Sequence, residues 1–139
     1  ALASGDAKFG LPETGLGIPP AQIAPFVVTR IGLTQARRLA LLGARFDGHE
    51  ACRLGIVHEA HDNPESLEQS LELILKQVKR CAPQANKITK ELMLSIGNKP
   101  LDTLLEDAAR SFSKAVQGSE GQEGTLAFVQ KRKPNWATE

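Results

Sequence analysis

Aromatic residues are scarce in this chain of 139 residues, which has five Phe, one Trp and no Tyr. Its core therefore has to be built from Leu, Ile, Val and Ala. Charge of one sign is also lacking, because 17 Lys and Arg nearly balance 16 Asp and Glu. The net charge of +1 creates no overall field to attract nucleic acid or an acidic membrane. We therefore expect neither of these as a partner.

Cysteine and long apolar runs are scarce as well. Cys52 and Cys81 lie far apart and lack the closely spaced pairs of a zinc site, so we expect no metal. We expect two buried, reduced thiols and a cytoplasmic location. No apolar run approaches the roughly 20 residues that span a membrane, and no secretory signal is visible. The histidines lack catalytic spacing with a Cys, Ser or second carboxylate, which predicts surface positions for His49, His58 and His61.

The first 20 residues combine short extended segments with a stiff loop. Segments 1–4 and 7–9 flank the turn signal Gly5-Asp6, and two such strands do not form a stable sheet alone. They favour either an extended terminus or part of a larger α/β protein. Residues 10–20 are rich in proline, which stiffens a loop, and in glycine, which lets it turn. Glu13 is the only acidic residue in this loop, which can hold its carboxylate in a fixed place.

From residue 20 onward the spacing of apolar residues predicts helices. Prolines and capping residues mark their starts, and glycines their ends. The expected elements are a helix over 21–31 bent at Pro25, a helix from Thr34 to about Leu42, a short helix from Asp47 through Leu54, an extended segment over 56–60, helices opened by Pro64, Pro83 and Pro100, and a last helix from about Gln122.

The segment Phe9-Gly10-Leu11-Pro12-Glu13, followed by Gly15, Gly17 and Pro19-Pro20, resembles the loop signature of the enoyl-CoA hydratase/isomerase (crotonase) family. Further pieces follow in the family's order, including Leu54-Gly55-Ile56-Val57 and the closing Lys131-Arg132-Lys133-Pro134-Asn135-Trp136. Each piece alone is weak, but the ordered set spans the whole chain and is specific.

The resemblance implies the C-terminal portion of an α/β crotonase fold (the ClpP/crotonase-like spiral), mostly helical here with two or three short strands. Residues 1–60 would end the spiral core and carry the catalytic loop 9–20. Residues 61–139 would form a helical region for oligomerisation and for covering coenzyme A (CoA). A homo-oligomer, trimer or hexamer, is the assembly expected for the family.

The resemblance also implies that the substrate is an acyl-CoA thioester and that no separate cofactor is needed. Family hydratases add water to a 2-enoyl-CoA with two glutamates, and two backbone N–H groups hold the thioester oxygen. Glu13 matches the second glutamate, with Pro12, Gly17 and Ala21 along the acyl pocket. The first glutamate and both N–H donors match nothing in the nine residues before Gly10. We therefore expect negligible hydratase activity from this chain alone, because one oxyanion donor is worth on the order of 100- to 1000-fold.

A CoA contact is expected near the C-terminus. Phe128 and Lys131 are three residues apart, which predicts a shared helix face, and an aromatic ring beside a cation suits adenine and its phosphates. In the family, matching positions of a neighbouring subunit cover the CoA adenine. Phe112 matches a third such position, although its place on an apolar stripe favours a core residue almost equally.

The stretch after the loop resembles hydratases of branched glutaconyl-CoAs, the 3-methylglutaconyl and isohexenylglutaconyl kinds, because it lacks the common Pro-Gly-x-Gly-Gly. Such substrates carry a second carboxylate, for which Arg30, Arg37 and Arg38 are candidate partners. Two alternatives stay open. One is a non-catalytic helical trimerisation or interaction module, and the other is an enoyl-CoA isomerase that shifts the double bond instead of adding water.

Overall fold

The computed structural model describes residues 1–137 and separates into two compact units, residues 1–72 and 73–139. The helix α3 (Pro64–Lys79) contributes to both units. The functional division expected at residue 60 stays a prediction, since compactness does not test it. None of the helices within the described residues is both long and apolar enough to cross a membrane.

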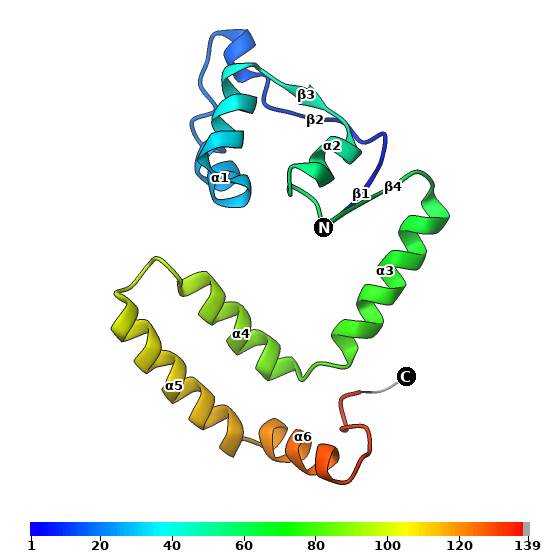
Figure 1. Cartoon of the computed structure of the whole chain (residues 1–139), viewed down its shortest axis with the longest axis vertical. Coiled ribbons are helices and arrows are strands. Elements are labelled where there is room, and N and C mark those ends of the chain that lie inside the picture. The colour runs from blue at the N-terminus through cyan, green and yellow to red at the C-terminus, as the bar shows by residue number, and fades with distance from the viewer. Residues whose placement is uncertain (138–139) are drawn as a thin grey trace. The chain divides into compact units, whose positions relative to one another are not determined.

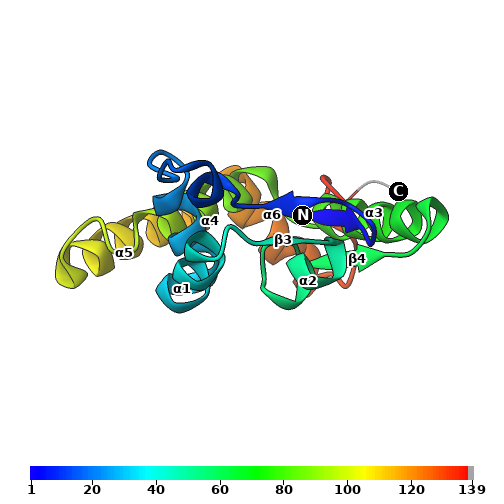
Figure 2. The same cartoon turned by 90° about the horizontal axis from the view of Figure 1, so that it is seen from above.

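Unit 1 contains short strands that pair across long sequence distances, together with three helical elements besides the start of α3 (Figures 1 and 2). Its elements are β1 (Leu2–Ser4), β2 (Phe9–Gly10), the 3-10 helix η1 (Glu13–Leu16), α1 (Ala24–Leu41), β3 (Arg45–Phe46), α2 (Gly48–Arg53), β4 (Glu59–His61) and the start of α3. β1 runs parallel to β4, and β2 runs antiparallel to β3. Both extended segments at the start of the chain therefore find partners within it.

The core of unit 1 consists of two small apolar clusters. Ala3, Ala51 and Val57 join β1 to α2 and the segment after it. Leu11, Leu39 and Leu54 form the second cluster, which joins the segment before η1 to α1 and α2. The stacked rings of Phe9 and Phe46, 5.9 Å apart, lie where β2 pairs with β3. These contacts hold the segments on both sides of the glycine–proline loop, residues 10–20, in place.

Two local predictions for unit 1 are confirmed. The Asp47 carboxylate accepts a hydrogen bond from the Glu50 N–H (2.9 Å) and caps α2, as its side-chain type favours. A break separates the two helices expected around residue 32, because Gly32 has φ 77° and ψ 158° inside α1. Glycine tolerates this positive φ without steric cost.

Unit 2 is helical, with α4 (Pro83–Ser95), α5 (Leu101–Gln117) and α6 (Ser119–Val129). α4 and α5 lie side by side, and α6 contacts the end of α5 (Figure 1). The last helix begins at Ser119 instead of near Gln122. The break before this helix lies at Gly118, which has an extended conformation (ψ 166°). Gly121 lies within α6, where any Cβ would overlap the Ala115 carbonyl oxygen.

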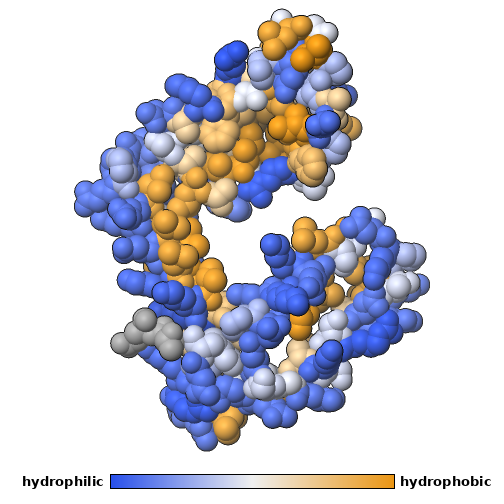
Figure 3. Space-filling model, turned by 180° about the vertical axis from the view of Figure 1, so that it is seen from behind, coloured by the Kyte–Doolittle hydropathy of each residue, from blue (hydrophilic) through white to orange (hydrophobic). Residues whose placement is uncertain are grey.

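The long helices leave much apolar surface uncovered. No described residue of α3, α4 or α5 is buried. Figure 3 shows an apolar stripe along one face of α3, and Leu71, Leu75 and Val78, which share a helix face, are exposed. The expectation of two buried thiols is wrong: Cys81 is exposed and Cys52 is half-buried, because Cys81 falls in the turn that ends α3.

Gly48 lies in close contact with the backbone of Ser4 and Gly5. Its N–H donates to the Gly5 carbonyl (2.9 Å), and an added Cβ would overlap the Ser4 carbonyl oxygen. We expect Gly48→Ala to lower the free energy of unfolding by about 2 kcal/mol or more, within or above the usual range for overpacking. Urea unfolding followed by circular dichroism measures this. Gly15→Ala is the control, because its Cβ meets no atom within 4 Å; equal losses in the two variants would contradict the steric argument.

Candidate functional site

Glu13 is the first residue of the 3-10 helix η1, which lies inside the glycine–proline loop. The Gly15 N–H donates to the Pro12 carbonyl (3.0 Å), and the Ile18 N–H donates to the Glu13 carbonyl (3.1 Å). Gly17 closes the turn in the left-handed region, with φ 77° and ψ 17°, where glycine fits without strain. The loop predicted from composition therefore has defined local structure around its single carboxylate.

The C-terminal end of α1 and the segment after it hold this loop on both sides of Glu13. On one side, the Leu11 N–H donates to the Ala44 carbonyl (3.0 Å), and the Leu11 side chain is buried. On the other side, the Thr14 hydroxyl donates to the Ala40 carbonyl (2.8 Å). The carboxylate is thus carried by a backbone that is fixed at two points to one helix end.

The Glu13 side chain is half-buried, and its Oε2 atom is shielded from solvent without a hydrogen-bond partner. Within residues 1–137 it is the only buried side-chain oxygen or nitrogen in this condition. A buried polar atom without a partner costs stability, and such an atom in a native protein calls for an explanation, of which catalysis is one. No described residue donates a hydrogen bond to the lone pairs of this oxygen.

The other residues expected along the acyl pocket lie on the same loop. Pro12 is half-buried and directly precedes η1, whereas Gly17 and Ala21 are exposed. Ala21 lies in the next turn, where its N–H donates to the Pro19 carbonyl (2.8 Å). Large apolar side chains on this loop and just after it are exposed, namely Leu16, Ile18, Ile23 and Phe26.

The charged candidates of unit 1 are mostly engaged by other groups. Arg30 donates from Nε to the Ile56 carbonyl (3.0 Å), and its Nη2 lies 3.3 Å from His58 Nε2. Arg38 lies close enough to Glu50 to help lower the pKa of that carboxyl, after the larger effect of the Arg53 hydrogen bond. Within residues 1–137, no group of three or more His, Cys, Asp or Glu side chains could hold a metal ion.

The expected CoA contacts lie in unit 2, and the argument from a shared helix face is wrong. α6 ends at Val129, and Lys131 has a positive φ of 53° in the turn that follows. Its N–H donates to the Phe128 carbonyl (3.1 Å), so the two residues are neighbours without sharing a helix face. The Phe128 side chain is 84% exposed and is available for a planar ligand.

Phe112 lies on α5 and is 71% exposed, which favours the contact interpretation over the core one. It lines a groove of about 790 Å³. The groove runs along α4, α5 and α6, with Ile88, Leu92, Val116 and Trp136 among its lining residues. Phe128 and Lys131 are not among the residues that line it, so the three CoA candidates do not form one pocket.

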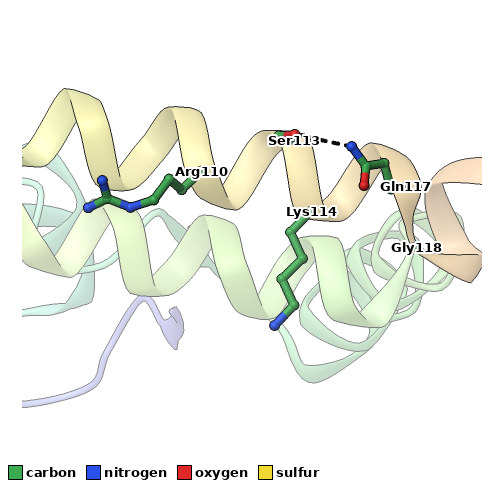
Figure 4. Close-up of a pocket in the computed structure, with 5 residues that line it drawn as sticks. All are labelled: Arg110, Ser113, Lys114, Gln117 and Gly118. Carbon is green, nitrogen blue, oxygen red and sulfur yellow. Dashed lines mark hydrogen bonds between the residues drawn. The ribbon is translucent and has the colours of Figure 1, made fainter.

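A second, smaller hollow of about 500 Å³ lies at the end of α5 and is lined by Arg110, Ser113, Lys114, Gln117 and Gly118. Figure 4 shows the side chains of Arg110 and Lys114 one helical turn apart, and the Gln117 amide donating to the Ser113 hydroxyl (3.4 Å). Arg110 also donates to Asp107 (2.5 Å), so its charge is largely balanced.

The turn that carries Lys131 is held by an ion pair. Arg132 donates to both carboxylate oxygens of Glu123 (2.6 and 2.9 Å), and the Asn135 N–H donates to Glu123 Oε1 (2.9 Å). The Arg132 hydrogen bond is the main cause that lowers the pKa of Glu123 to about 2. The Trp136 indole N–H donates to the Arg80 carbonyl (3.1 Å), which fixes the segment beyond the turn.

The low pKa of Glu123 predicts an acid-dependent stability. A carboxyl whose folded pKa is depressed stabilises the fold above its unfolded pKa, and this contribution disappears as the pH falls toward the folded pKa of about 2. We expect the free energy of unfolding to fall more steeply from pH 5 to pH 3 in the unaltered chain than in Glu123→Gln. Urea unfolding at both pH values measures the difference, and Glu91→Gln, at an exposed site on α4, is the control. Equal slopes for Glu123→Gln and the unaltered chain would contradict the assignment.

Sequence reasoning missed Thr14, which matches no catalytic pattern, and whose partner Ala40 is 26 residues away. It also missed η1, since four residues among prolines and glycines give no helical periodicity.

Comparison with known proteins matches the whole chain. A family model described as enoyl-CoA hydratase/isomerase matches residues 1–139. Among solved structures, AtuE of Pseudomonas aeruginosa is 65% identical with a TM-score of 0.96, over 99% of this chain and 54% of that one. An enoyl-CoA hydratase/isomerase from Marinobacter aquaeolei is 56% identical with a TM-score of 0.95, over 99% of this chain and 52% of that one.

A curated relative, the mevalonyl-coenzyme A hydratase of Aspergillus fumigatus, is 32% identical over 141 residues, which cover 97% of this chain and 51% of that protein. The chain spans about half the length of the curated relatives it matches.

Proposed function

The chain belongs to the enoyl-CoA hydratase/isomerase family, and on this basis we propose that the protein that carries it hydrates a 2-enoyl-CoA thioester with Glu13 as an acid/base. The crotonase fold expected from the resemblance is confirmed by structures that match 99% of the chain. Because the chain spans about half the length of its relatives, the activity of the whole protein is part of the proposal.

One observation carries the proposal: a carboxylate on a stiff loop has a buried oxygen that no described residue hydrogen-bonds. A general acid or base has to lie within hydrogen-bond reach of the proton that it moves. It also works best when the surrounding residues fix its position. Glu13 meets the second condition through the bonds of Leu11 and Thr14 to the chain around the end of α1.

In the proposed reaction, a water oxygen bonds to the β-carbon of the enoyl group, and a proton bonds to the α-carbon. Glu13 accepts a hydrogen bond from that water and takes part in the transfer of its proton. Charge that develops on the thioester oxygen is held by backbone N–H donors, which we assign to residues outside these 139. The observed loop contributes position and a proton acceptor, and it excludes water from one carboxylate oxygen.

Glu13→Gln keeps the size of the side chain but removes its proton-accepting charge. We expect kcat for hydration of crotonyl-CoA to fall by at least about 100-fold, the lower range for loss of a general acid/base. Loss of absorbance of the enoyl thioester measures the rate in the protein that carries this chain. Glu68→Gln, at an exposed position of α3, is the control and keeps full activity.

The outcome also separates the alternative functions. Retained hydration in Glu13→Gln would rule out the acid/base role. A product with a shifted double bond and no added water would identify an isomerase. A protein that forms oligomers but neither hydrates nor isomerises enoyl-CoA thioesters would support the non-catalytic trimerisation or interaction module.

The acyl group is proposed to be a branched glutaconyl group, on the basis of the residues from Pro20 to Val28. The relatives are named for different acyl groups, for example mevalonyl-CoA, which is consistent with an acyl pocket that differs among members of the family. Arg30 is engaged by the Ile56 carbonyl and His58, and Arg38 lies near the Glu50 carboxylate, which leaves Arg37 as the candidate partner for a second carboxylate. A higher kcat/KM for 3-methylglutaconyl-CoA than for crotonyl-CoA in the same assay supports this choice, and the reverse order contradicts it.

We assign Phe128, Lys131 and Phe112 to the CoA moiety and the exposed apolar faces of α3, α4 and α5 to a homo-oligomer, a trimer or a hexamer. Both aromatic rings are exposed, and Lys131 adjoins Phe128 through its N–H bond. In an oligomer, these rings can cover a ligand held by a second copy. The apolar stripes would become buried there, as contiguous exposed patches of this kind normally are.

Lys131→Ala tests the CoA assignment. We expect Kd for CoA to rise about three- to tenfold, the effect of losing one exposed charge-assisted contact with a phosphate. Isothermal titration calorimetry at low and high salt measures the change, which decreases at high salt because the contact is exposed. Lys90→Ala, on the exposed surface of α4, is the control. Equal Kd values for Lys131→Ala and the unaltered protein would remove Lys131 from the site.

A further inference from the structure

The Thr14 hydroxyl makes the side-chain bond that ties the Glu13 turn to α1. It donates to the Ala40 carbonyl at 2.8 Å, across 26 residues of sequence. Ala40 lies in the last turn of α1, where helix carbonyls lack intrahelical partners. The Ala40 carbonyl also accepts the Gly43 N–H (3.3 Å), so the Thr14 hydroxyl adds a second hydrogen bond to it and connects the helix end to the residue after Glu13.

The surface that receives the turn is shaped to it. Gly43 has φ 56° just after α1, and a Cβ built on it would lie 3.5 Å from the Thr14 hydroxyl oxygen and 3.7 Å from the Gly15 nitrogen. The Leu11 N–H bonds to the Ala44 carbonyl (3.0 Å) on the far side of Glu13. Ala40 at the end of α1, and Gly43 and Ala44 after it, thus contact the chain on both sides of Glu13.

From this arrangement we infer that Thr14 is a positioning residue, whose hydroxyl fixes the direction of the Glu13 carboxylate. The inference rests on the proposed acid/base function of Glu13. Leu11 is held by both a main-chain bond and a buried side chain, whereas the chain after Glu13 has Thr14 as its side-chain anchor. Loss of the hydroxyl frees the turn on that side, and a displacement near 1 Å can cost on the order of 100-fold in rate.

Thr14→Val removes the donor and keeps the shape, while Thr14→Ser keeps the donor. Ala40 still accepts the Gly43 N–H (3.3 Å), so little stability should be lost. We expect Thr14→Val to lower kcat about 10- to 100-fold with KM within about twofold, and Thr14→Ser to restore kcat. Thr29→Val is the matched control, because the Thr29 hydroxyl also donates to a carbonyl, Pro25, at 2.8 Å; it keeps full activity.

Hydrogen exchange supplies a readout that does not depend on turnover. In Thr14→Val, the amides of Gly15, Gly17 and Ile18, which form the turn, should exchange about tenfold faster, because local opening becomes easier. The Ala51 amide, which bonds to the Asp47 carbonyl in α2, should be unchanged. Thr14→Ser should restore slow exchange. Thr14→Ala also lacks the hydroxyl and should show the same faster exchange as Thr14→Val, which provides a second variant in case valine disturbs the fold.

A combined variant separates this inference from the proposed function. If Thr14 acts through Glu13, Thr14→Val lowers activity no further in a Glu13→Gln background. If Glu13→Gln is inactive but Thr14→Val is fully active with unchanged exchange, the positioning role is overturned and the acid/base role stands. If Thr14→Ser is as impaired as Thr14→Val, the hydroxyl alone does not hold the turn, which also overturns the inference. If Glu13→Gln is fully active, the proposed function fails first.

Discussion

The attachment of the Glu13 loop to the end of α1 and the segment after it is the interaction on which the candidate site depends, and it leaves one carboxylate oxygen of Glu13 buried and unpaired. A glutamate in a surface loop would normally turn its carboxylate to water, because burial without a partner costs about 1–3 kcal/mol. Here the backbone is held on both sides of Glu13. Leu11 is buried in the cluster with Leu39 and Leu54, and Thr14 is bonded to the end of α1. The stability lost at one oxygen is offset by the apolar and main-chain contacts of its neighbours.

Much of this loop could be predicted from sequence, because its conformation is local. Proline fixes φ and glycine permits positive φ, so a stiff turn with a left-handed residue was foreseeable, and Gly17 supplies that residue. The Asp47 cap was foreseeable for the same reason. The bond from Thr14 to Ala40 was not, since no periodicity links residues 26 apart. The pairing of β1 with β4 joins residues 57 apart and was equally hidden.

Prediction was weaker at the C-terminus, where tertiary contacts decide the ends of helices. The spacing of Phe128 and Lys131 indicated one helix face, but the Arg132–Glu123 pair and the Asn135 bond draw the chain out of the helix after Val129. At its start, α6 includes Gly121, a residue that helix propensity disfavours. Close approach to Ala115 requires a residue without a side chain there. Packing thus overrides local preference at both ends of α6.

The buried and the exposed apolar residues of this chain differ in kind. Within residues 1–137 the buried apolar residues are only Ala, Leu and Val, as the scarcity of aromatic residues indicated. The rings of Phe26, Phe112 and Phe128 are all more than 70% exposed. A stable protein rarely leaves this much apolar surface in water unless another surface or a ligand covers it. These three rings are therefore available for recognition, whereas Phe9 and Phe46 stack beside a core of aliphatic side chains.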